Sequence, residues 1–255
     1  MRFASIGSGS EGNGLVVEAG ATRILIDCGF GLRDTAARLE RIGLTPESLD
    51  AILVTHEHAD HICGVPAFAA RYRIPVWLTF GTLMVVGDQL INNERVYGFD
   101  SHEAFAIGDL EIRPFPVPHD AREPVQFVLS DGAFRVGVVT DLGTSTPYVE
   151  ASLTGCDALV LECNHDVTLL AESDYPVSLK ARIAGRFGHL DNDRARTLLA
   201  ALDTARLQHI LAAHLSQQNN TPGRARAALA GALGCTAEWI GIADQSNGFG
   251  WRTLS

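Results

Sequence analysis

The sequence predicts an α/β protein of four layers, an αββα sandwich in which two mixed sheets pack face to face with helices outside. Three observations lead to this prediction. Short apolar runs separated by turn signals fill the first third of the 255-residue chain, and a second strand-rich stretch follows in the middle. Helical patterns accompany both stretches, and no Pro/Gly/Ser-rich linker divides the chain. We therefore expect residues 1–255 to form a single domain.

The first part of the chain predicts strands interrupted by helices. Residues 32–43 place apolar side chains at helical spacing and end on Gly43, which is typical of a helix terminus. Residues 65–73 and 81–90 predict two further helices. The expected strands of this part are residues 2–6, 14–19, 22–27, 51–56 and 75–79.

The second part begins with two predicted hairpins, whose turns are Gly108–Asp109 and Asp131–Gly132. Amphipathic patterns then predict helices at residues 191–202 and 221–233. The expected strands of this part are residues 104–107, 110–117, 125–130, 133–140, 157–163, 209–214, 237–243 and 248–254.

Composition limits the classes of function. The net charge of −10 argues against a protein that coats nucleic acid non-specifically, although it leaves room for a local phosphate-binding cleft. The five cysteines are an odd number without CxxC spacing, so neither a disulfide framework nor a structural zinc site is expected. No apolar run is long enough to span a membrane, and the start lacks the long apolar region of a signal peptide. We expect a cytoplasmic protein without a membrane partner.

The heptapeptide THEHADH at residues 55–61 contains three of the nine histidines and directly follows an apolar run. Alternation from the strand end projects His56 and His58 to one side, and a turn through Ala59 brings Asp60 and His61 to a second point. Imidazole and carboxylate are ligands that borderline divalent metals prefer. This spacing predicts two adjacent metal sites.

Two metal sites need more ligands than one loop provides. His119, Asp141 and His214 each stand at the end of another apolar run. As a single residue, each is more often ordinary polar punctuation at a strand end. Their recurrence beside the histidine motif favours a shared metal centre.

These motifs together resemble the metallo-β-lactamase superfamily. THEHADH is preceded by LIDCG and followed by VPHD, VVTDLG and AAHLS. SIGSGSEGN, LECNHD, GHLDN and HLSQQNNTP further resemble the YycJ (WalJ) branch, whose members are 5′→3′ DNA exonucleases. The resemblance covers nearly the whole chain. It implies a dinuclear metal-dependent phosphodiester hydrolase that acts on DNA through a metal-bridging hydroxide.

The resemblance also implies a role for each ligand. One metal would be bound by His56, His58 and His119. The other would be bound by Asp60, His61 and His214, and Asp141 would bridge the two metals. Asp60 would also belong to the catalytic residues, and Asp27 would orient a ligand histidine. The sequence leaves open whether the two metal ions are Mn²⁺, Zn²⁺ or Fe.

His189 is the candidate general acid, because related phosphodiesterases use a histidine in a similar Gly-His context. A helix-cap histidine is the alternative, since an acidic helix start follows it. Arg182 and Arg186 are candidates for contacts with further phosphates. The substrate-binding candidates, each a weak signal alone, are Ser10, Asn13, Asn164 and His165.

Other functions use the same ligands. A cyclic-phosphate phosphodiesterase, or a thioesterase or lactonase of the glyoxalase II type, is the alternative hydrolase. A flavodiiron protein would need a flavin domain, which nothing in the chain supplies. A binding module without catalysis would not need every ligand, and β-lactamase activity fits neither the N-terminus nor His189.

Overall fold

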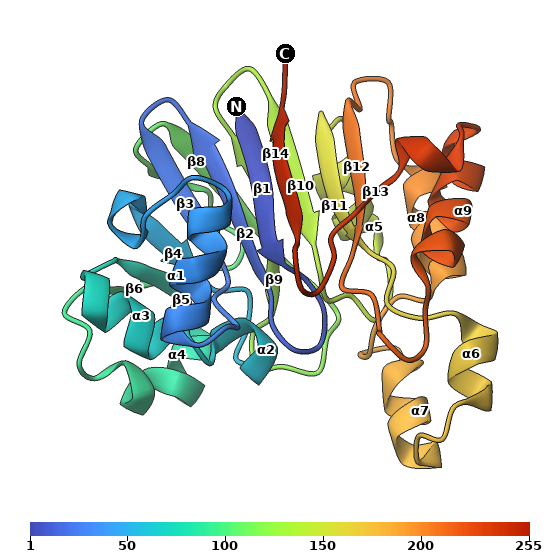
Figure 1. Ribbon diagram of the computed structural model, residues 1–255, viewed down its shortest axis with the longest axis horizontal. Coiled ribbons are helices and arrows are strands. Elements are labelled where there is room, and N and C mark those ends of the chain that lie inside the picture. Colours follow the sequence, from blue (N-terminus) through green and yellow to red (C-terminus); the bar gives the residue numbers. More distant parts are fainter.

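Two seven-stranded sheets face each other at the centre of the molecule, and helices cover their outer faces (Figure 1). The computed structural model describes residues 1–255. The predicted αββα sandwich of the α/β class is confirmed. The core between the sheets draws on both halves of the chain. This agrees with a single domain at residues 1–255, which stays a prediction.

The first sheet is antiparallel on one side and parallel on the other. Strands β14, β1, β2 and β3 pair antiparallel, whereas β3, β4, β5 and β6 pair parallel. The order across the sheet is β14-β1-β2-β3-β4-β5-β6. The bounds are β1 Arg2–Gly7, β2 Gly14–Ala19, β3 Thr22–Ile26, β4 Ala51–Leu53, β5 Val76–Thr79, β6 Val96–Phe99 and β14 Phe249–Thr253.

The second sheet repeats this mixed arrangement. Strands β7 to β10 form an antiparallel meander, whereas β10 to β13 pair parallel. Both predicted hairpins are present, between β7 and β8 and between β9 and β10. The bounds are β7 Phe105–Ile107, β8 Leu110–Pro116, β9 Val125–Ser130, β10 Arg135–Val139, β11 Ala158–Glu162, β12 His209–Ala213 and β13 Gly241–Ile242.

Helices α1, α3 and α4 lie beside the first sheet, and α5, α8 and α9 lie beside the second (Figure 1). Helices α6 and α7 project below the second sheet as a separate lobe. The bounds are α1 Leu32–Arg41, α2 Ala59–Ile62, α3 Val65–Tyr72, α4 Phe80–Val86, α5 Pro147–Leu153, α6 Val167–Glu172, α7 Val177–Ile183, α8 Asn192–Ala201 and α9 Pro222–Leu233. None of these helices combines the length and apolar character that crossing a bilayer requires.

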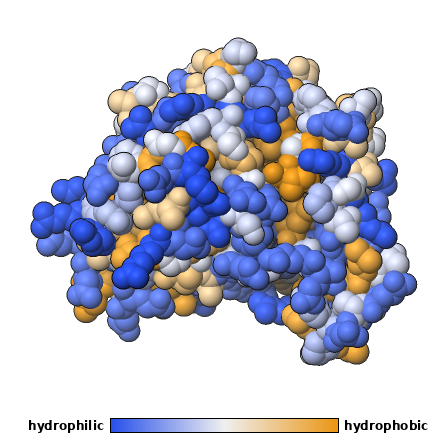
Figure 2. Space-filling model, viewed as in Figure 1, coloured by the Kyte–Doolittle hydropathy of each residue, from blue (hydrophilic) through white to orange (hydrophobic).

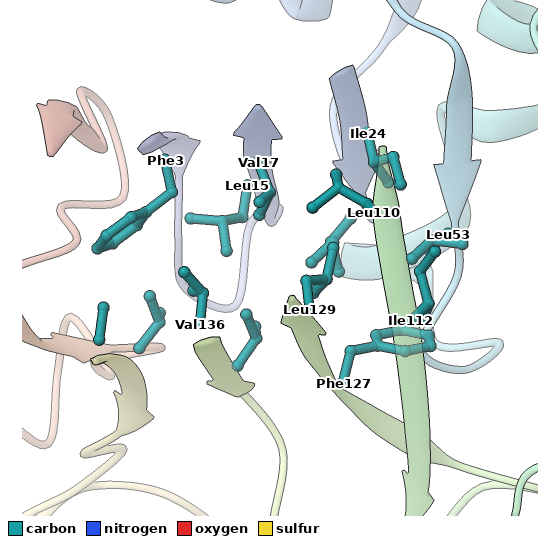
Figure 3. Close-up of a cluster of buried hydrophobic side chains, with 14 of the residues drawn as sticks. Phe3, Leu15, Val17, Ile24, Leu53, Leu110, Ile112, Phe127, Leu129 and Val136 are labelled. Atoms are coloured by element: carbon teal, nitrogen blue, oxygen red, sulfur yellow. The ribbon is translucent and has the colours of Figure 1, made fainter. Parts of the chain in front are cut away.

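The main core lies between the two sheets. Labelled side chains of the first sheet, such as Leu15 and Ile24, and of the second, such as Leu129 and Val136, point into the space between the sheets (Figure 3). Burying a large apolar side chain stabilises the fold by roughly 1.5–3 kcal/mol. The face of the molecule in Figure 2 is mostly hydrophilic, with apolar residues gathered in patches.

The strand predicted at residues 237–243 is wrong over most of its length. Ala237–Trp239 form a 3₁₀ helix, and β13 contains only Gly241–Ile242. The edge position explains the short strand, since β13 pairs with β12 alone. The helix predicted at residues 81–90 also changes type, because α4 ends at Val86 and a 3₁₀ turn covers Gly87–Leu90.

The loop after β3 packs tightly against the loop after β4. A Cβ atom on Gly29 would lie 1.8 Å from the carbonyl oxygen of Asp60. That carbonyl also accepts a 2.8 Å hydrogen bond from the Asn13 amide. Glycine at position 29 therefore lets three segments meet beneath the histidine motif.

We predict that Gly29→Ala lowers the free energy of unfolding by about 1–3 kcal/mol, because the added methyl group forces the Asp60 carbonyl to move. The measurement is urea unfolding followed by circular dichroism. Gly250→Ala is the matched control, since a Cβ on Gly250 meets no atom within 4 Å. Equal stability of the two variants would contradict the packing argument.

Candidate metal centre

The seven predicted ligands lie together at one end of the sandwich. Four of them follow β4, and the others follow β8, β10 and β12. Each strand thus delivers its ligand to the same edge, which explains why apolar runs ended by polar residues recur in the sequence. The ligands that form close groups here are His56, His58, Asp60, His61, His119, Asp141 and His214.

Three histidines form the first pocket. One ring nitrogen from each of His56, His58 and His119 lies within 4.8 Å of the others. The Nδ1 of His58 and the Nε2 of His119 are 3.2 Å apart, and the buried Nε2 of His56 has no hydrogen-bond partner. A tetrahedral cation such as Zn²⁺ takes its nitrogen ligands in this manner. This pocket therefore fits a divalent metal ion.

Backbone carbonyls hold two of these rings from behind. His58 Nε2 donates to the carbonyl of Asp120 at 3.2 Å, and His119 Nδ1 donates to the carbonyl of Gly188 at 2.9 Å. A neutral imidazole that donates from one nitrogen offers a lone pair on the other. Both rings consequently aim their lone pairs into the first pocket.

Asp60, His61 and His214 form the second pocket. The Nε2 atoms of His61 and His214 each lie 3.3 Å from Asp60 Oδ2. His214 Nδ1 faces the carbonyl of Thr140 at 2.6 Å, which turns Nε2 toward the pocket. His214 adopts a left-handed backbone conformation with φ of 52°. Such strain in a non-glycine residue is typical of functional sites.

Asp27 lies behind the second pocket, and its proposed role in orienting a ligand histidine stays a prediction. Its carboxylate accepts hydrogen bonds from the backbone amide and the hydroxyl of Thr55, both at 2.8 Å. It also lies 2.7 Å from His61 Nδ1. Asp27 has φ of 59°, so it too is strained. One buried carboxylate thereby fixes both the histidine loop and one ligand ring.

Asp141 lies between the two pockets. Its Oδ2 atom is 3.1 Å from His61 Nε2, and its Oδ1 atom is 3.7 Å from His119 Nε2. The side chain is buried, and Oδ2 has no hydrogen-bond partner. This is the position that a bridging carboxylate needs. The bridging role itself stays a prediction.

The two pockets differ in their affinity for protons. Burial lowers the pKa of His56 and of His119, which favours the neutral form of these two imidazoles in the first pocket. Burial also acts to lower the pKa of His61 and His214, but the surrounding carboxylates, Asp141 foremost and Asp60 with it, together outweigh burial and raise both pKa values. The second pocket therefore competes more strongly for protons.

A cavity lies beside the two metal pockets, and His189 lines it. His189 is paired with Glu162, a residue that the sequence did not reveal as a site residue. His189 Nδ1 lies 2.7 Å from Glu162 Oε1, while Glu162 Oε2 accepts from the amides of Leu142 and Leu190. Burial acts to lower the pKa of His189, but the charge and the hydrogen bond of Glu162, together with the charge of Asp141, outweigh burial and raise that pKa. The available signal for Glu162 was a carboxylate ending the apolar run of β11.

Asp120 is a second residue that the sequence analysis did not single out. Its carboxylate accepts a 2.6 Å hydrogen bond from Arg182 Nε of α7. Arg182 lines the cavity beside the metal pockets, whereas Arg186 does not line it. The only feature of the sequence that pointed to Asp120 as a site residue was its position directly after His119.

The substrate-binding candidates separate into two groups. Ser10 and Asn164 line the cavity, together with Ser216, which the sequence analysis did not single out. Asn13 and His165 are buried behind it. Asn13 Nδ2 donates to the Asp60 carbonyl at 3.3 Å, so this residue supports the loop that carries Asp60.

The cavity has a volume of about 320 Å³. Residues of the metal pockets and His189 line part of the cavity, and α7 with the preceding segment lines another part. This volume falls in the range of small-ligand sites. Such an arrangement can hold a charged group at the metals and a further part of the ligand against α7.

Comparison with known proteins identifies relatives of the chain. The model of the Beta-lactamase superfamily domain matches residues 22–211. The chain is 34% identical over 229 residues to the exodeoxyribonuclease YycJ of Bacillus anthracis, covering 89% of this chain and 86% of that protein. It is 32% identical over 227 residues to the exodeoxyribonuclease WalJ of Streptococcus pneumoniae, covering 86% and 83%. Among solved structures, the metallo-β-lactamase fold protein YhfI of Bacillus subtilis superimposes with a TM-score of 0.77 at 18% identity, over 99% of both chains.

We predict that the protein binds two divalent ions near neutral pH and loses the second-pocket ion first as the pH falls. The raised pKa values of His61 and His214 let protons displace that ion at a higher pH. The lowered pKa values of His56 and His119 delay the same competition in the first pocket. Elemental analysis after dialysis at a series of pH values should give a ratio of metal ions to protein that falls in two steps as the pH decreases.

Asp141→Asn should lower the number of metal ions bound per protein at saturation below two, because the substitution removes a negative charge from between the pockets. His102→Ala is the matched control, since the His102 side chain is 64% exposed. A wild-type ratio that saturates near one, or an unchanged ratio in Asp141→Asn, would contradict the assignment.

Proposed function

The chain belongs to the β-lactamase superfamily and is a metal-dependent hydrolase, and on this premise we propose that it is a phosphodiesterase that degrades DNA from a 5′ end. The relatives named exodeoxyribonucleases match most of the chain, which supports DNA as the substrate. The cytoplasmic location and the 5′→3′ direction belong to the same proposal.

One observation carries the choice of reaction: the His189–Glu162 pair in the cavity wall. The 2.7 Å contact engages Nδ1 of His189, so Nε2 is the nitrogen that can meet a substrate. The raised pKa keeps the ring protonated nearer to neutral pH. A phosphodiester releases a basic alkoxide, which needs a proton. The pair supplies a proton donor beside the two pockets.

Two divalent ions held by the seven ligands would supply a hydroxide nucleophile and charge for the phosphate oxygens. The other tasks fall to side chains of this chain. Asp60 faces the cavity as well as the second pocket, and we assign it to orienting the attacking water. Ser10 and Asn164 are positioned to hold substrate oxygens. His189 then donates its proton to the leaving oxygen.

A cyclic-phosphate phosphodiesterase is the second candidate. The cavity of about 320 Å³ is enclosed by α7 on one side and suits a nucleotide-sized ligand. A thioesterase is less well supported, because a thiolate leaves readily without an acid such as His189. The acidic surface limits electrostatic capture of DNA, so polymer binding would depend on contacts near the metals.

We predict hydrolysis of bis-p-nitrophenyl phosphate and of 5′-phosphorylated duplex DNA, with added Mn²⁺ or Zn²⁺. S-lactoylglutathione and nitrocefin should remain intact. DNA labelled at one end or the other will distinguish the direction, since 5′→3′ degradation releases a 5′ label first. Hydrolysis of S-lactoylglutathione without any phosphodiester cleavage would refute the proposal. Cleavage of small cyclic phosphates alone would favour the second candidate.

We predict that His189→Ala slows cleavage of a natural sugar–phosphate linkage by ~10²–10⁴-fold, the usual contribution of general acid catalysis. The same variant should lose far less activity toward bis-p-nitrophenyl phosphate, because p-nitrophenolate is a stable leaving group. The measurement compares single-turnover rates on both substrates.

Elemental analysis is the control, since the variant should keep the wild-type metal content. Loss of a metal ion would mean that His189 is a ligand. Equal slowing of both substrates with metals retained would mean that His189 positions the phosphate and does not protonate the leaving group.

A further inference from the structure

Part of the cavity wall is apolar. Tyr175, Leu179 and Ile183 all line the cavity. Leu179 and Ile183 lie four residues apart in α7 and share one face of that helix, whereas Tyr175 reaches the cavity from the segment before the helix. Val177 on the same helix is 84% exposed, which marks the opposite face. The lower edge of the molecule is indented beside this lobe (Figures 1 and 2).

A charged residue lies on the same wall. Arg182 borders the cavity on α7, next to Ile183, and its Nε is 2.6 Å from Asp120 Oδ2. His58 and His189 line the same cavity. The cavity therefore combines an apolar surface, a guanidinium group and two metal pockets. A ligand that matches all three has a phosphoryl group joined to a flat, largely apolar group, as a nucleotide does.

We propose that Tyr175, Leu179 and Ile183 form a subsite for the nucleobase of the nucleotide next to the scissile phosphate. This inference rests on the proposed phosphodiesterase function. Contact through ring faces does not read the edges of a base, so the subsite accepts all four bases. It does require an unpaired base, because a base within a duplex is stacked on its neighbours. The enzyme thus acts on a terminal nucleotide that has separated from its partner.

Two chromogenic esters test the subsite: thymidine 3′-(p-nitrophenyl phosphate), which carries its nucleoside as the 5′-terminal nucleotide of DNA does, and methyl p-nitrophenyl phosphate. Both release p-nitrophenolate, and they differ in the presence of the nucleoside. Stacking of one base on an aromatic residue corresponds to about tenfold to a hundredfold in affinity. The wild-type kcat/KM should favour the thymidine ester by a factor of that order, and Tyr175→Ala should remove most of this preference through KM.

Two variants separate stacking from a loss of structure in α7. Tyr175→Phe keeps the ring and should retain most of the preference. Val177→Ala changes the outer face of the same helix and should leave the preference unchanged. Retention of the full preference in Tyr175→Ala overturns the subsite, as does an equal loss in Val177→Ala.

The esters also separate the subsite from the proposed function. Wild-type enzyme that hydrolyses both esters with equal kcat/KM keeps the phosphodiesterase function and overturns the subsite. Wild-type enzyme that hydrolyses neither ester, although loaded with metal, overturns both. On DNA, an abasic residue at the 5′ end should slow the wild type about tenfold or more and slow Tyr175→Ala much less. Equal slowing of both enzymes overturns the subsite.

Discussion

Each ligand imidazole is tied to the protein scaffold through the ring nitrogen that faces away from the metal pockets. Asp27 holds His61, and the carbonyls of Thr140 and Gly188 hold His214 and His119. Since a neutral imidazole has a single lone pair, each tie decides where that lone pair points. The ties come from loops of both sheets. The sandwich must therefore keep its two edges in register for the pockets to exist, and the left-handed conformations of Asp27 and His214 are a consequence of that demand.

Buried charge links the pockets to folding. The carboxylates of Asp27, Asp141 and Glu162 are almost fully buried at this edge, with the partly exposed Asp60 beside them. Removing a carboxylate from water costs several kcal/mol, which a partner must offset. Protonated histidines offset part of this cost, but each proton occupies a nitrogen that a metal ion would need. Divalent ions bound in the two pockets would supply positive charge while leaving the imidazoles neutral, so metal binding would stabilise the fold through the same groups.

The sequence predicted those features that follow from a local rule. Apolar runs ended by polar residues pointed to the candidate ligands at the strand ends, because strands that run in the same direction bring their ends to one edge. Glu162 was not identified, although the run that it ends was recognised. Its role depends on the parallel register of β11 with β10 and β12, which places it beside Asp141 and His214. Which strands become neighbours is a property of the whole fold. The sequence did not predict the lobe formed by α6 and α7, because helices of one or two turns show too little apolar periodicity to be recognised.

Asp120 connects the α7 wall to the first pocket by two separate groups. Its backbone carbonyl holds His58, whereas its carboxylate holds Arg182. The Arg182–Asp120 pair is partly exposed, at 60% and 32%, so it contributes at most about 1 kcal/mol to stability. A substrate phosphate can consequently draw Arg182 away from Asp120 at little cost. The hydrogen bond from the His58 ring to the Asp120 carbonyl is kept during that exchange, because it involves the backbone of Asp120 and not its side chain. The cavity wall can adjust to a ligand while the geometry of the metal pocket stays fixed.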